Sequence, residues 1–215
     1  MSFTREKFER FIRTCPYFIQ KMVISAIEKR EYDAWVRSKK PLPPARIVKE
    51  KLIERYKDKT GYKTMVETGT YRGDMVFTHL KKFDKIYSIE LDDWLYNTAV
   101  KRFKSFPHVK ILHGDSGKVL THLMNELQEP AIFWLDGHYS GGFTAMGEKV
   151  TPIYEELKTI FLKKFDHVIL IDDARLFNGA DGYPTFDDLK KFIHHHYPQQ
   201  QIEVDDDCIQ FILKH

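Results

Sequence analysis

The sequence predicts an α/β fold built on a mostly parallel sheet with helices on both faces. Short apolar runs of strand length alternate with segments of helical length over most of the chain, which is the pattern of parallel sheets. Acidic residues directly follow several of these runs, at the sheet edge where such folds bind ligands. Near the C-terminus, two strand-like runs flank Asp205-Asp206-Asp207, and so short a connection predicts an antiparallel pair.

The composition indicates a globular protein of one domain without a nucleic-acid or membrane partner. The 215 residues are 42% hydrophobic, and 34 basic against 31 acidic residues give a net charge of +3, too balanced for a polyanion-binding surface. Cys15 and Cys208 lie far apart, without metal or redox spacing. No signal-peptide pattern and no run of ~18 apolar residues is present, so we expect a cytoplasmic protein.

Helical spacing of apolar residues dominates the N-terminal part of the chain. The pattern predicts helices over 3–14, 17–37 and 44–61. Between the last two, the segment 38–44 contains three prolines and is expected to be a linker. We therefore expect residues 1–62 to form a helical extension of a domain that spans 63–215. These helices would pack on the main domain, cover its ligand site or form a homodimer.

From Lys63 onward the pattern alternates regularly between strands and helices. Strands are predicted at 64–67, 85–90, 109–113, 131–135 and 167–171, and helices at 73–82, 92–105, 116–128, 149–164 and 184–196. The final pair of strands, 201–204 and 208–213, would end the sheet in an antiparallel arrangement.

A glycine turn follows the first predicted strand, and we interpret it as a nucleotide cradle. It reads Glu67-Thr68-Gly69-Thr70-Tyr71-Arg72-Gly73. We expect its backbone N–H groups to point out of the turn, where glycine lets a ligand approach closely. The two glycines stand four residues apart, so the turn is neither the dinucleotide-binding fingerprint nor a P-loop.

The acid at the start of this turn favours a particular kind of ligand. Glu67 would repel a pyrophosphate, whereas it suits a ligand that carries an ammonium group. This argument favours S-adenosylmethionine over NAD or ATP. Glu90 closes the second strand, 21 positions after Gly69, and is placed to accept both hydroxyls of a ribose. NAD-binding and S-adenosylmethionine-binding folds share that feature, so it does not choose between them.

Polar residues also follow the third, fourth and fifth strands. Asp115 would accept a hydrogen bond from an adenine amino group, or cap the helix that starts near Ser116, or both. Asp136, Asp172 and Asp173 follow neighbouring strands and would lie close together. Three carboxylates in one cleft repel one another unless a cation or protons intervene, and oxygen ligands favour Mg²⁺. Alternatively, some of these acids cap helices or bind Arg175.

Taken in order, these strand-end motifs resemble class I S-adenosylmethionine-dependent methyltransferases. The motifs are Val66-Glu67-Thr68-Gly69-Thr70-Tyr71, Ile89-Glu90, Gly114-Asp115-Ser116, Trp134-Leu135-Asp136-Gly137-His138 and Ile171-Asp172-Asp173. The match is closest to small bacterial and archaeal methyltransferases that are uncharacterised, and more distant to metal-dependent O-methyltransferases. It covers the chain from about Pro43 to the C-terminus.

The resemblance implies a Rossmann-like seven-stranded sheet in the order 3-2-1-4-5-7-6, with the last strand antiparallel. It implies cofactor contacts from Glu67, Gly69, Thr70, Gly73, Glu90, Asp115, Ser116 and Asp136. By analogy with the metal-dependent members, it implies a cation on Asp136, Asp172 and Asp173. The chain departs from the catechol-type enzymes among these metal-dependent members where Asp173 replaces an asparagine and where Tyr139 stands in the place of a lysine base.

We therefore predict methyl transfer from S-adenosylmethionine to the hydroxyl of a small-molecule acceptor, assisted by a divalent cation such as Mg²⁺. Asp136 and His138 are the candidate catalytic residues, with His138 as the base, although a lone histidine in such a loop is ordinarily a surface residue. The glycine-rich loop 137–147 is a candidate lid. The alternatives are an NAD-linked oxidoreductase and a non-catalytic ligand-binding protein of the same fold.

Overall fold

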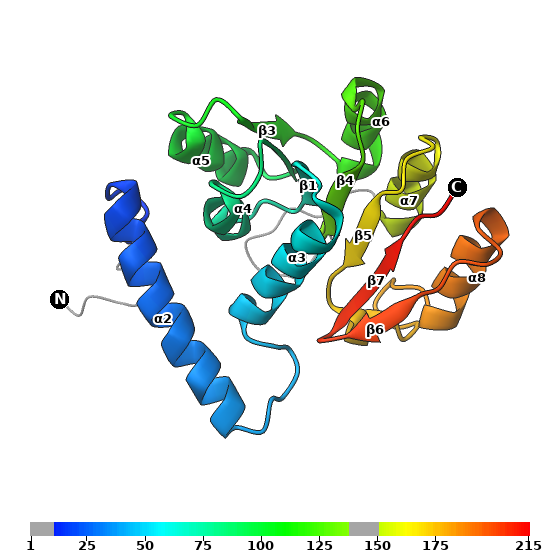
Figure 1. Ribbon diagram of the computed structural model, residues 1–215, viewed down its shortest axis with the longest axis horizontal. Helices are drawn as coiled ribbons and strands as arrows, with labels where there is room; N and C mark the ends of the chain where they lie inside the picture. Colours follow the sequence, from blue (N-terminus) through cyan, green and yellow to red (C-terminus); the bar gives the residue numbers. More distant parts are fainter. Residues whose placement is uncertain (1–10, 138–150) are drawn as a thin grey trace.

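A seven-stranded sheet forms the centre of the molecule (Figure 1). The computed structural model describes residues 11–137 and 151–215. The strands are β1 (Thr64–Thr68), β2 (Lys85–Glu90), β3 (Val109–His113), β4 (Ala131–Leu135), β5 (Val168–Ile171), β6 (Glu203–Asp205) and β7 (Cys208–Ile212). Their order in the sheet is β3-β2-β1-β4-β5-β7-β6, and β7 runs antiparallel to both of its neighbours. This confirms the predicted sheet.

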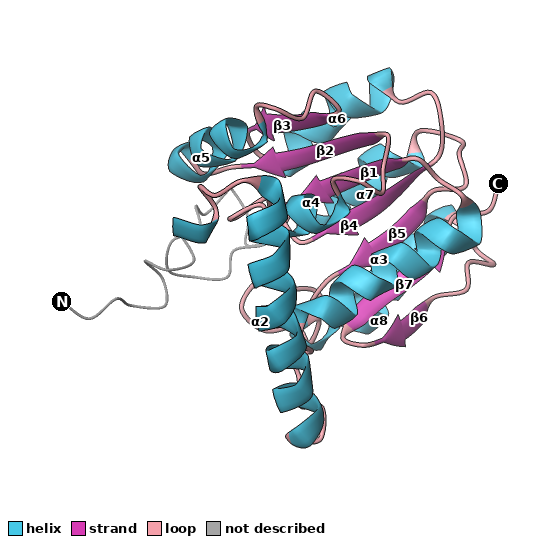
Figure 2. Cartoon of the chain, turned by 60° about the vertical axis from the view of Figure 1, so that its left-hand side comes forward, coloured by secondary structure: helices cyan, strands magenta, loops and turns pink. Residues whose placement is uncertain are grey.

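Helices cover both faces of the sheet (Figure 2). They are α2 (Tyr17–Arg37), α3 (Arg46–Thr60), α4 (Asp74–His79), α5 (Asp93–Phe103), α6 (Ser116–Glu126), α7 (Ile153–Phe161) and α8 (Phe186–His196), with a short 3₁₀-helix, η1 (Ala174–Leu176). Helices α3, α4 and α5 pack in one hydrophobic cluster, and α6, α7 and α8 pack in another. The prediction of a sheet covered on both faces is therefore confirmed.

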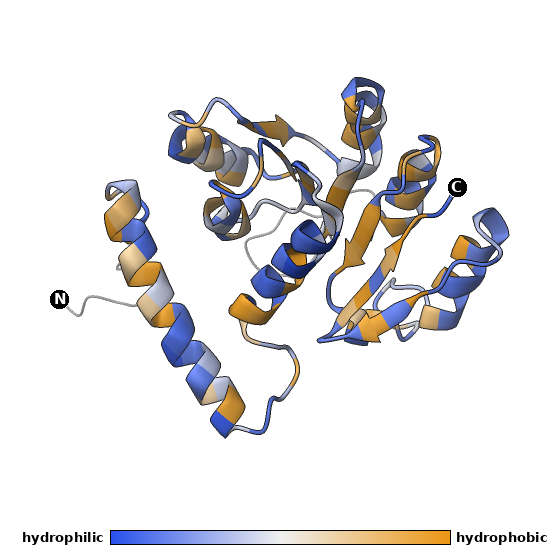
Figure 3. Ribbon diagram, viewed as in Figure 1, coloured by the Kyte–Doolittle hydropathy of each residue, from blue (hydrophilic) through white to orange (hydrophobic). Residues whose placement is uncertain are grey.

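Successive residues of each central strand contribute to opposite clusters. Val66 and Phe133 pack with α6 and α7, whereas Met65 and Trp134 pack with α3, α4 and α5. Side chains alternate between the two faces of a strand, so consecutive residues such as Phe133 and Trp134 are both apolar where the strand is covered on both sides. Figure 3 shows this continuous hydrophobic character in β5.

The N-terminal helices differ in how they meet the sheet. Leu52, Ile53 and Tyr56 of α3 are buried in the core, so this helix is part of the layer that covers the sheet. Helix α2 extends along the side of the molecule (Figure 1). The proposed division at residues 62 and 63 stays a prediction. Within the described ranges, no helix is both long and apolar enough to cross a membrane.

Local chemistry accounts for the ends of several elements. The β6–β7 turn has two central residues, Asp206 and Asp207, at φ values of 49° and 61°, as in a type I′ hairpin turn. Helix α4 ends at His79 rather than at the predicted Lys82, because Leu80 and Lys82 donate to carbonyls only three residues back.

Candidate functional site

The carboxyl ends of the parallel strands bring the predicted acids to one edge of the sheet. Register pairs Glu90 of β2 with His113 at the end of β3, and Thr68 of β1 with Leu135 at the end of β4. Leu135 in turn pairs with Ile171 at the end of β5. The residues that follow these strands therefore form one contiguous edge, as expected for a ligand site in an open α/β sheet.

The glycine cradle is held together by its own backbone hydrogen bonds. The N–H groups of Gly69 and Thr70 donate to the Ile89 carbonyl at 2.9 and 3.2 Å, and the Gly73 N–H donates to the Thr70 carbonyl at 2.8 Å. The Tyr71 N–H donates to the Glu90 carboxylate at 2.7 Å. The expectation that these N–H groups point out toward a ligand is therefore wrong for these four residues. A phosphate would find these donors already taken.

Both cradle glycines are required by close packing. Gly69 has a φ of +84°, and a Cβ atom there would lie 2.4 Å from the carbonyl oxygen of Asp136. Gly73 has a φ of +72°, and its Cβ atom would lie 2.7 Å from the ring of Phe103. The glycines thus let the turn approach the end of β4 and the helix α5, which ties the cradle to the acidic side of the site.

Glu67 lies beneath the cradle rather than on its surface. Its side chain is buried, and its carboxyl accepts a hydrogen bond from the Ser88 hydroxyl. Ser88 is also hydrogen-bonded to the hydroxyl of the buried Thr70, at 2.6 Å. Burial raises the pKa of Glu67 to about 8, because a charged carboxylate is costly away from water. This placement favours a supporting role for Glu67 and Thr70 over direct contact with an ammonium group.

Glu90 joins the cradle to the loop after β2. Its two carboxylate oxygens accept from the N–H groups of Tyr71, at 2.7 Å, and Asp92, at 2.9 Å. Burial raises the pKa of Glu90, and these hydrogen bonds oppose the increase. A carboxylate offers about four acceptor positions, so two ribose hydroxyls are chemically compatible with this arrangement.

The polar side chains that follow β3 make hydrogen bonds within the protein. Asp115 caps α6, and its carboxylate accepts from the Gly117 N–H at 2.9 Å. The helix-cap alternative is thus present in the structure. Ser116 is buried and donates to the carboxylate of Glu156 in α7 at 2.6 Å. Glu156 was not foreseen because it lies forty residues further along the chain.

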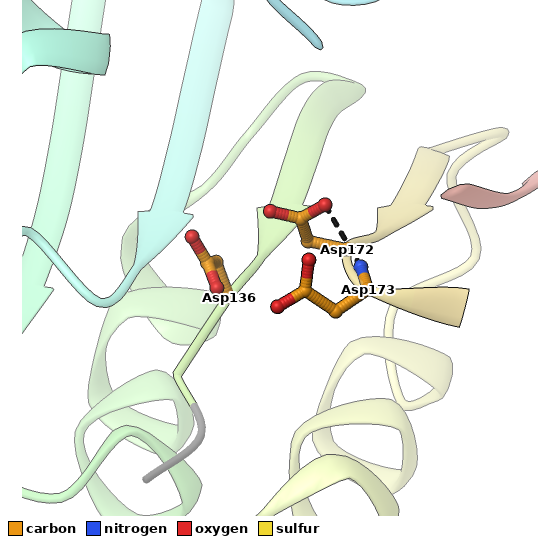
Figure 4. A group of neighbouring side chains, drawn as sticks. All are labelled: Asp136, Asp172 and Asp173. Atoms are coloured by element: carbon orange, nitrogen blue, oxygen red, sulfur yellow. Dashed lines mark hydrogen bonds between the residues drawn. The ribbon is translucent and has the colours of Figure 1, made fainter. Parts of the chain in front are cut away.

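The three aspartates predicted to hold a cation lie together beyond β4 and β5 (Figure 4). One carboxylate oxygen each of Asp136, Asp172 and Asp173 lies within 4.8 Å of the others. Asp172 is buried, and its Oδ1 atom accepts from the Asp173 N–H at 2.8 Å. Asp173 has a φ of +56°, a left-handed conformation that turns the chain sharply after β5. We call these three residues the acidic trio.

A lysine that the sequence interpretation missed enters the acidic trio from α3. The Lys49 Nζ atom lies 2.5 Å from Asp172 Oδ2 and 3.1 Å from Asp173 Oδ1. Burial disfavours the charged ammonium, but the neighbouring carboxylates outweigh it and raise the pKa of Lys49 above its ordinary value. A signal was present in the sequence, since Lys49 shares a helical stripe with the apolar Leu52, Ile53 and Tyr56.

Arg175 supplies a second cation at this site. Its guanidinium lies 2.7 Å from Asp173 Oδ1 and also pairs with Asp207 of the β6–β7 turn. The Asp207 carboxylate accepts from the Arg175 N–H as well, at 2.9 Å. The alternative in which the acids bind Arg175 therefore holds for Asp173. The acidic hairpin turn fixes the segment that carries the acidic trio.

The arrangement of the acidic trio does not fit a divalent cation while Lys49 is in place. Mg²⁺ requires oxygen ligands at about 2.0–2.1 Å in octahedral geometry. The Lys49 ammonium already bridges two of the three carboxylates that would supply those oxygens. Metal binding by Asp136, Asp172 and Asp173 stays a prediction. The candidate base His138 and most of the candidate lid lie outside the described residues.

Solved structures with the same architecture are methyltransferases. The O-methyltransferase TomG of Streptomyces achromogenes, involved in tomaymycin synthesis and solved with SAM (S-adenosylmethionine), aligns over 86% of this chain and 87% of its own at TM-score 0.57 and 14% identity. The O-methyltransferase of Bacillus cereus, solved with SAH, aligns over 88% and 91% at TM-score 0.56 and 15% identity. The SAH-bound methyltransferase PaMTH1 of Podospora anserina aligns over 100% and 98% at TM-score 0.53 and 17% identity.

These similarities establish the fold of the chain. The strand order 3-2-1-4-5-7-6 with an antiparallel seventh strand is the Rossmann-like fold of the methyltransferases with which it aligns. No protein-family model and no curated protein matches the sequence. At such low identities the shared fold does not transfer a substrate or a catalytic residue, so the function has to be argued from the site.

Proposed function

We propose that this protein is a SAM-dependent methyltransferase that methylates a hydroxyl group of a small molecule. The observation that carries the ribose-binding part of the proposal is the position of Glu90, at the end of β2 and in hydrogen-bond contact with the cradle at the Tyr71 N–H. In this fold, an acid at the end of the second strand is suited to accept the hydroxyls of a ribose. The methyltransferase architecture of the aligned structures supports the same reading.

The hydrogen bonding of the cradle supports SAM over a dinucleotide. A pyrophosphate needs backbone donors, and the N–H groups of Gly69, Thr70, Tyr71 and Gly73 are engaged within the protein. SAM carries no phosphate, so this closed turn does not count against it. This observation disfavours the NAD-linked oxidoreductase.

The chain's own contribution to methyl transfer would be mainly positional. The sulfonium of bound SAM supplies an already activated methyl group, so the protein has to align donor and acceptor and exclude water. Glu90 and Gly69 would hold the donor side, and Asp136 at the end of β4 would face the acceptor side. His138 stays the predicted base. No step is assigned to the predicted divalent cation, because the Lys49 ammonium lies on two of the three carboxylates that would bind it.

Calorimetric titration tests the identity of the cofactor. We expect saturable binding of SAM and of SAH by the purified protein, and no binding of NAD under the same conditions. Incubation with methyl-labelled SAM and panels of phenols, sugars and amines then tests the acceptor, with label expected on hydroxyl oxygens. Binding of NAD without SAM would overturn the proposal. Binding of SAM without transfer to any acceptor would favour the non-catalytic alternative.

Substitution of Glu90 tests the observation that carries the proposal. Charge-assisted hydrogen bonds contribute about 1.5–3 kcal/mol each, so Glu90→Ala is expected to weaken SAM binding at least about tenfold. Glu126→Ala is the matched control, because Glu126 is an exposed acid at the end of α6. Thermal unfolding of both variants separates lost affinity from lost folding. Unchanged affinity in a folded Glu90→Ala variant would contradict the assignment.

A further inference from the structure

The acidic trio and Lys49 disagree with the cation site that the sequence implies. We infer that the ammonium of Lys49 is the resident cation of the acidic trio, and that it takes the place of a divalent metal ion in this protein. Three carboxylates within 4.8 Å of one another repel unless a cation or protons intervene, and Lys49 Nζ is hydrogen-bonded to two of them. This assignment turns the candidate metal site into an internal ion-pair cluster.

The Lys49 side chain is largely buried, so its ammonium belongs to the interior of the site rather than to the solvent-exposed surface. The side chain of Lys49 is 15% exposed, and those of Asp172 and Asp173 are 3% and 14% exposed. The attraction between the Lys49 ammonium and these carboxylates is strong, because little water reaches the charges to screen it. A divalent ion would have to displace the ammonium and leave it without its partners, which opposes metal binding.

The backbone that carries Lys49 is fixed by the hydrophobic core. Leu52, Ile53 and Tyr56 continue the same face of α3 and pack beneath the sheet. On the other side, Arg175 and Asp207 hold the segment that bears Asp173. Both halves of the cluster are therefore set by rigid elements, and the site does not need a metal ion to bring them together.

The consequence for catalysis rests on the proposed function. If SAM-dependent methyl transfer takes place at this edge, it should proceed without a divalent cation. The positive charge beside the acceptor would then be that of Lys49, which acts as a positioning residue. The metal-binding question itself needs no methyl donor, so it can be tested whether or not the proposed function holds.

Manganese binding, followed by electron paramagnetic resonance of free Mn²⁺, tests the inference on the protein alone. We expect no saturable binding by the wild type below about 1 mM, the weak end of carboxylate sites. Lys49→Met removes the ammonium and should bind Mn²⁺ at least about tenfold more tightly than the wild type. That gain should disappear in Lys49→Met combined with Asp136→Asn. Lys49→Arg keeps the charge and should not gain binding.

Lys51→Met is the matched control, because Lys51 is an exposed lysine on the same helix whose Nζ lies 5.4 Å from the ring of Tyr32. It should behave like the wild type. Tight Mn²⁺ binding by the wild type that Asp136→Asn abolishes would overturn the inference. So would a folded Lys49→Met variant that gains no binding. If Lys49→Met does not fold, the wild-type titration decides by itself, and failure of SAM binding would bear on the proposed function alone.

Discussion

At the scale of single residues, Gly69 shows how a sequence motif can have two physical origins. Glycine in such a turn suggests close approach by a ligand. At Gly69, however, the space that a Cβ atom would fill is taken by the carbonyl group of Asp136. Its conformation and its packing both exclude other residues. The glycine is therefore explained by the contact between the cradle and β4, whatever ligand the cradle holds.

Gly69→Ala is predicted to destabilise the protein more than a comparable glycine substitution elsewhere. Gly61→Ala is the matched control, because Gly61 has a φ of +72° and nothing within 4 Å of its Cβ position. The control should cost about 1–2 kcal/mol for the left-handed conformation alone. Gly69→Ala should cost clearly more, because its Cβ atom would overlap the Asp136 carbonyl. Urea unfolding measures both, and equal losses would contradict this account.

Glu67 is predicted to make stability depend on pH. In the folded protein the Glu67 carboxyl has a pKa of about 8 and stays protonated until the pH approaches that value. In the unfolded chain a glutamate loses its proton near pH 4.5. Its contribution to stability is thus fully present below about pH 4.5 and is lost as the pH rises toward 8. Glu67→Gln removes this loss, so its stability relative to the wild type should rise by at least ~1 kcal/mol between pH 5 and pH 8.

Glu129→Gln provides the control for that measurement. Its hydrogen bond from Thr64 lowers the pKa of Glu129, so any effect of this carboxylate falls below pH 5. The difference between Glu129→Gln and the wild type should be flat from pH 5 to pH 8. A flat difference for Glu67→Gln as well would show that Glu67 is ionised in the folded protein.

At the scale of elements, Asp74 joins three segments beside the cradle. It begins α4, and its carboxylate binds Arg13 near the start of the described chain at 2.6 Å. The same carboxylate lies 2.8 Å from the guanidinium of Arg102 in α5. Burial alone would raise the pKa of Asp74, but these two arginines lower it to about 2. The N-terminal segment is therefore anchored to the turn that forms the cradle.

Asp74→Asn is predicted to loosen this junction. Loss of the carboxylate leaves the buried Arg102 without its charged partner, and unfolding should become easier by about 2–3 kcal/mol at pH 7. The stability that Asp74 adds is present above about pH 4 and is lost as the pH falls toward 2. Asp84→Asn breaks an exposed pair with Lys63 and should cost less than about 0.5 kcal/mol. Similar losses for both variants in chemical denaturation would refute the prediction.

At the scale of the whole molecule, the N-terminal helices carry an unassigned apolar surface. Phe18 and Met22 are 69% and 67% exposed, and they lie one helical turn apart on α2. The homodimer through these helices, like the cytoplasmic location and the absence of nucleic-acid and membrane partners, stays a prediction.

The predicted homodimer can be measured directly. Light scattering should give the mass of two chains for the wild type, and Phe18→Lys combined with Met22→Lys should give one. Val204→Lys serves as the control, since Val204 is exposed on the edge strand β6 at the other side of the sheet. A monomeric wild type would exclude a dimer through α2.

The sequence by itself determined the architecture and one edge of the site. Strand and helix periods are local patterns, so they correctly predicted a parallel sheet that ends in an antiparallel pair, and the acids that end neighbouring strands correctly predicted the meeting of Asp136, Asp172 and Asp173. The strand order itself followed from the resemblance that these strand-end motifs carry. Only the tertiary structure decided what surrounds these acids. Lys49 is separated from Asp172 by 123 residues, and no local pattern encodes such a contact. Only the tertiary structure likewise showed that the N–H groups of the cradle are already hydrogen-bonded, to Ile89 and Glu90 of the neighbouring strand β2 and to the Thr70 carbonyl within the turn.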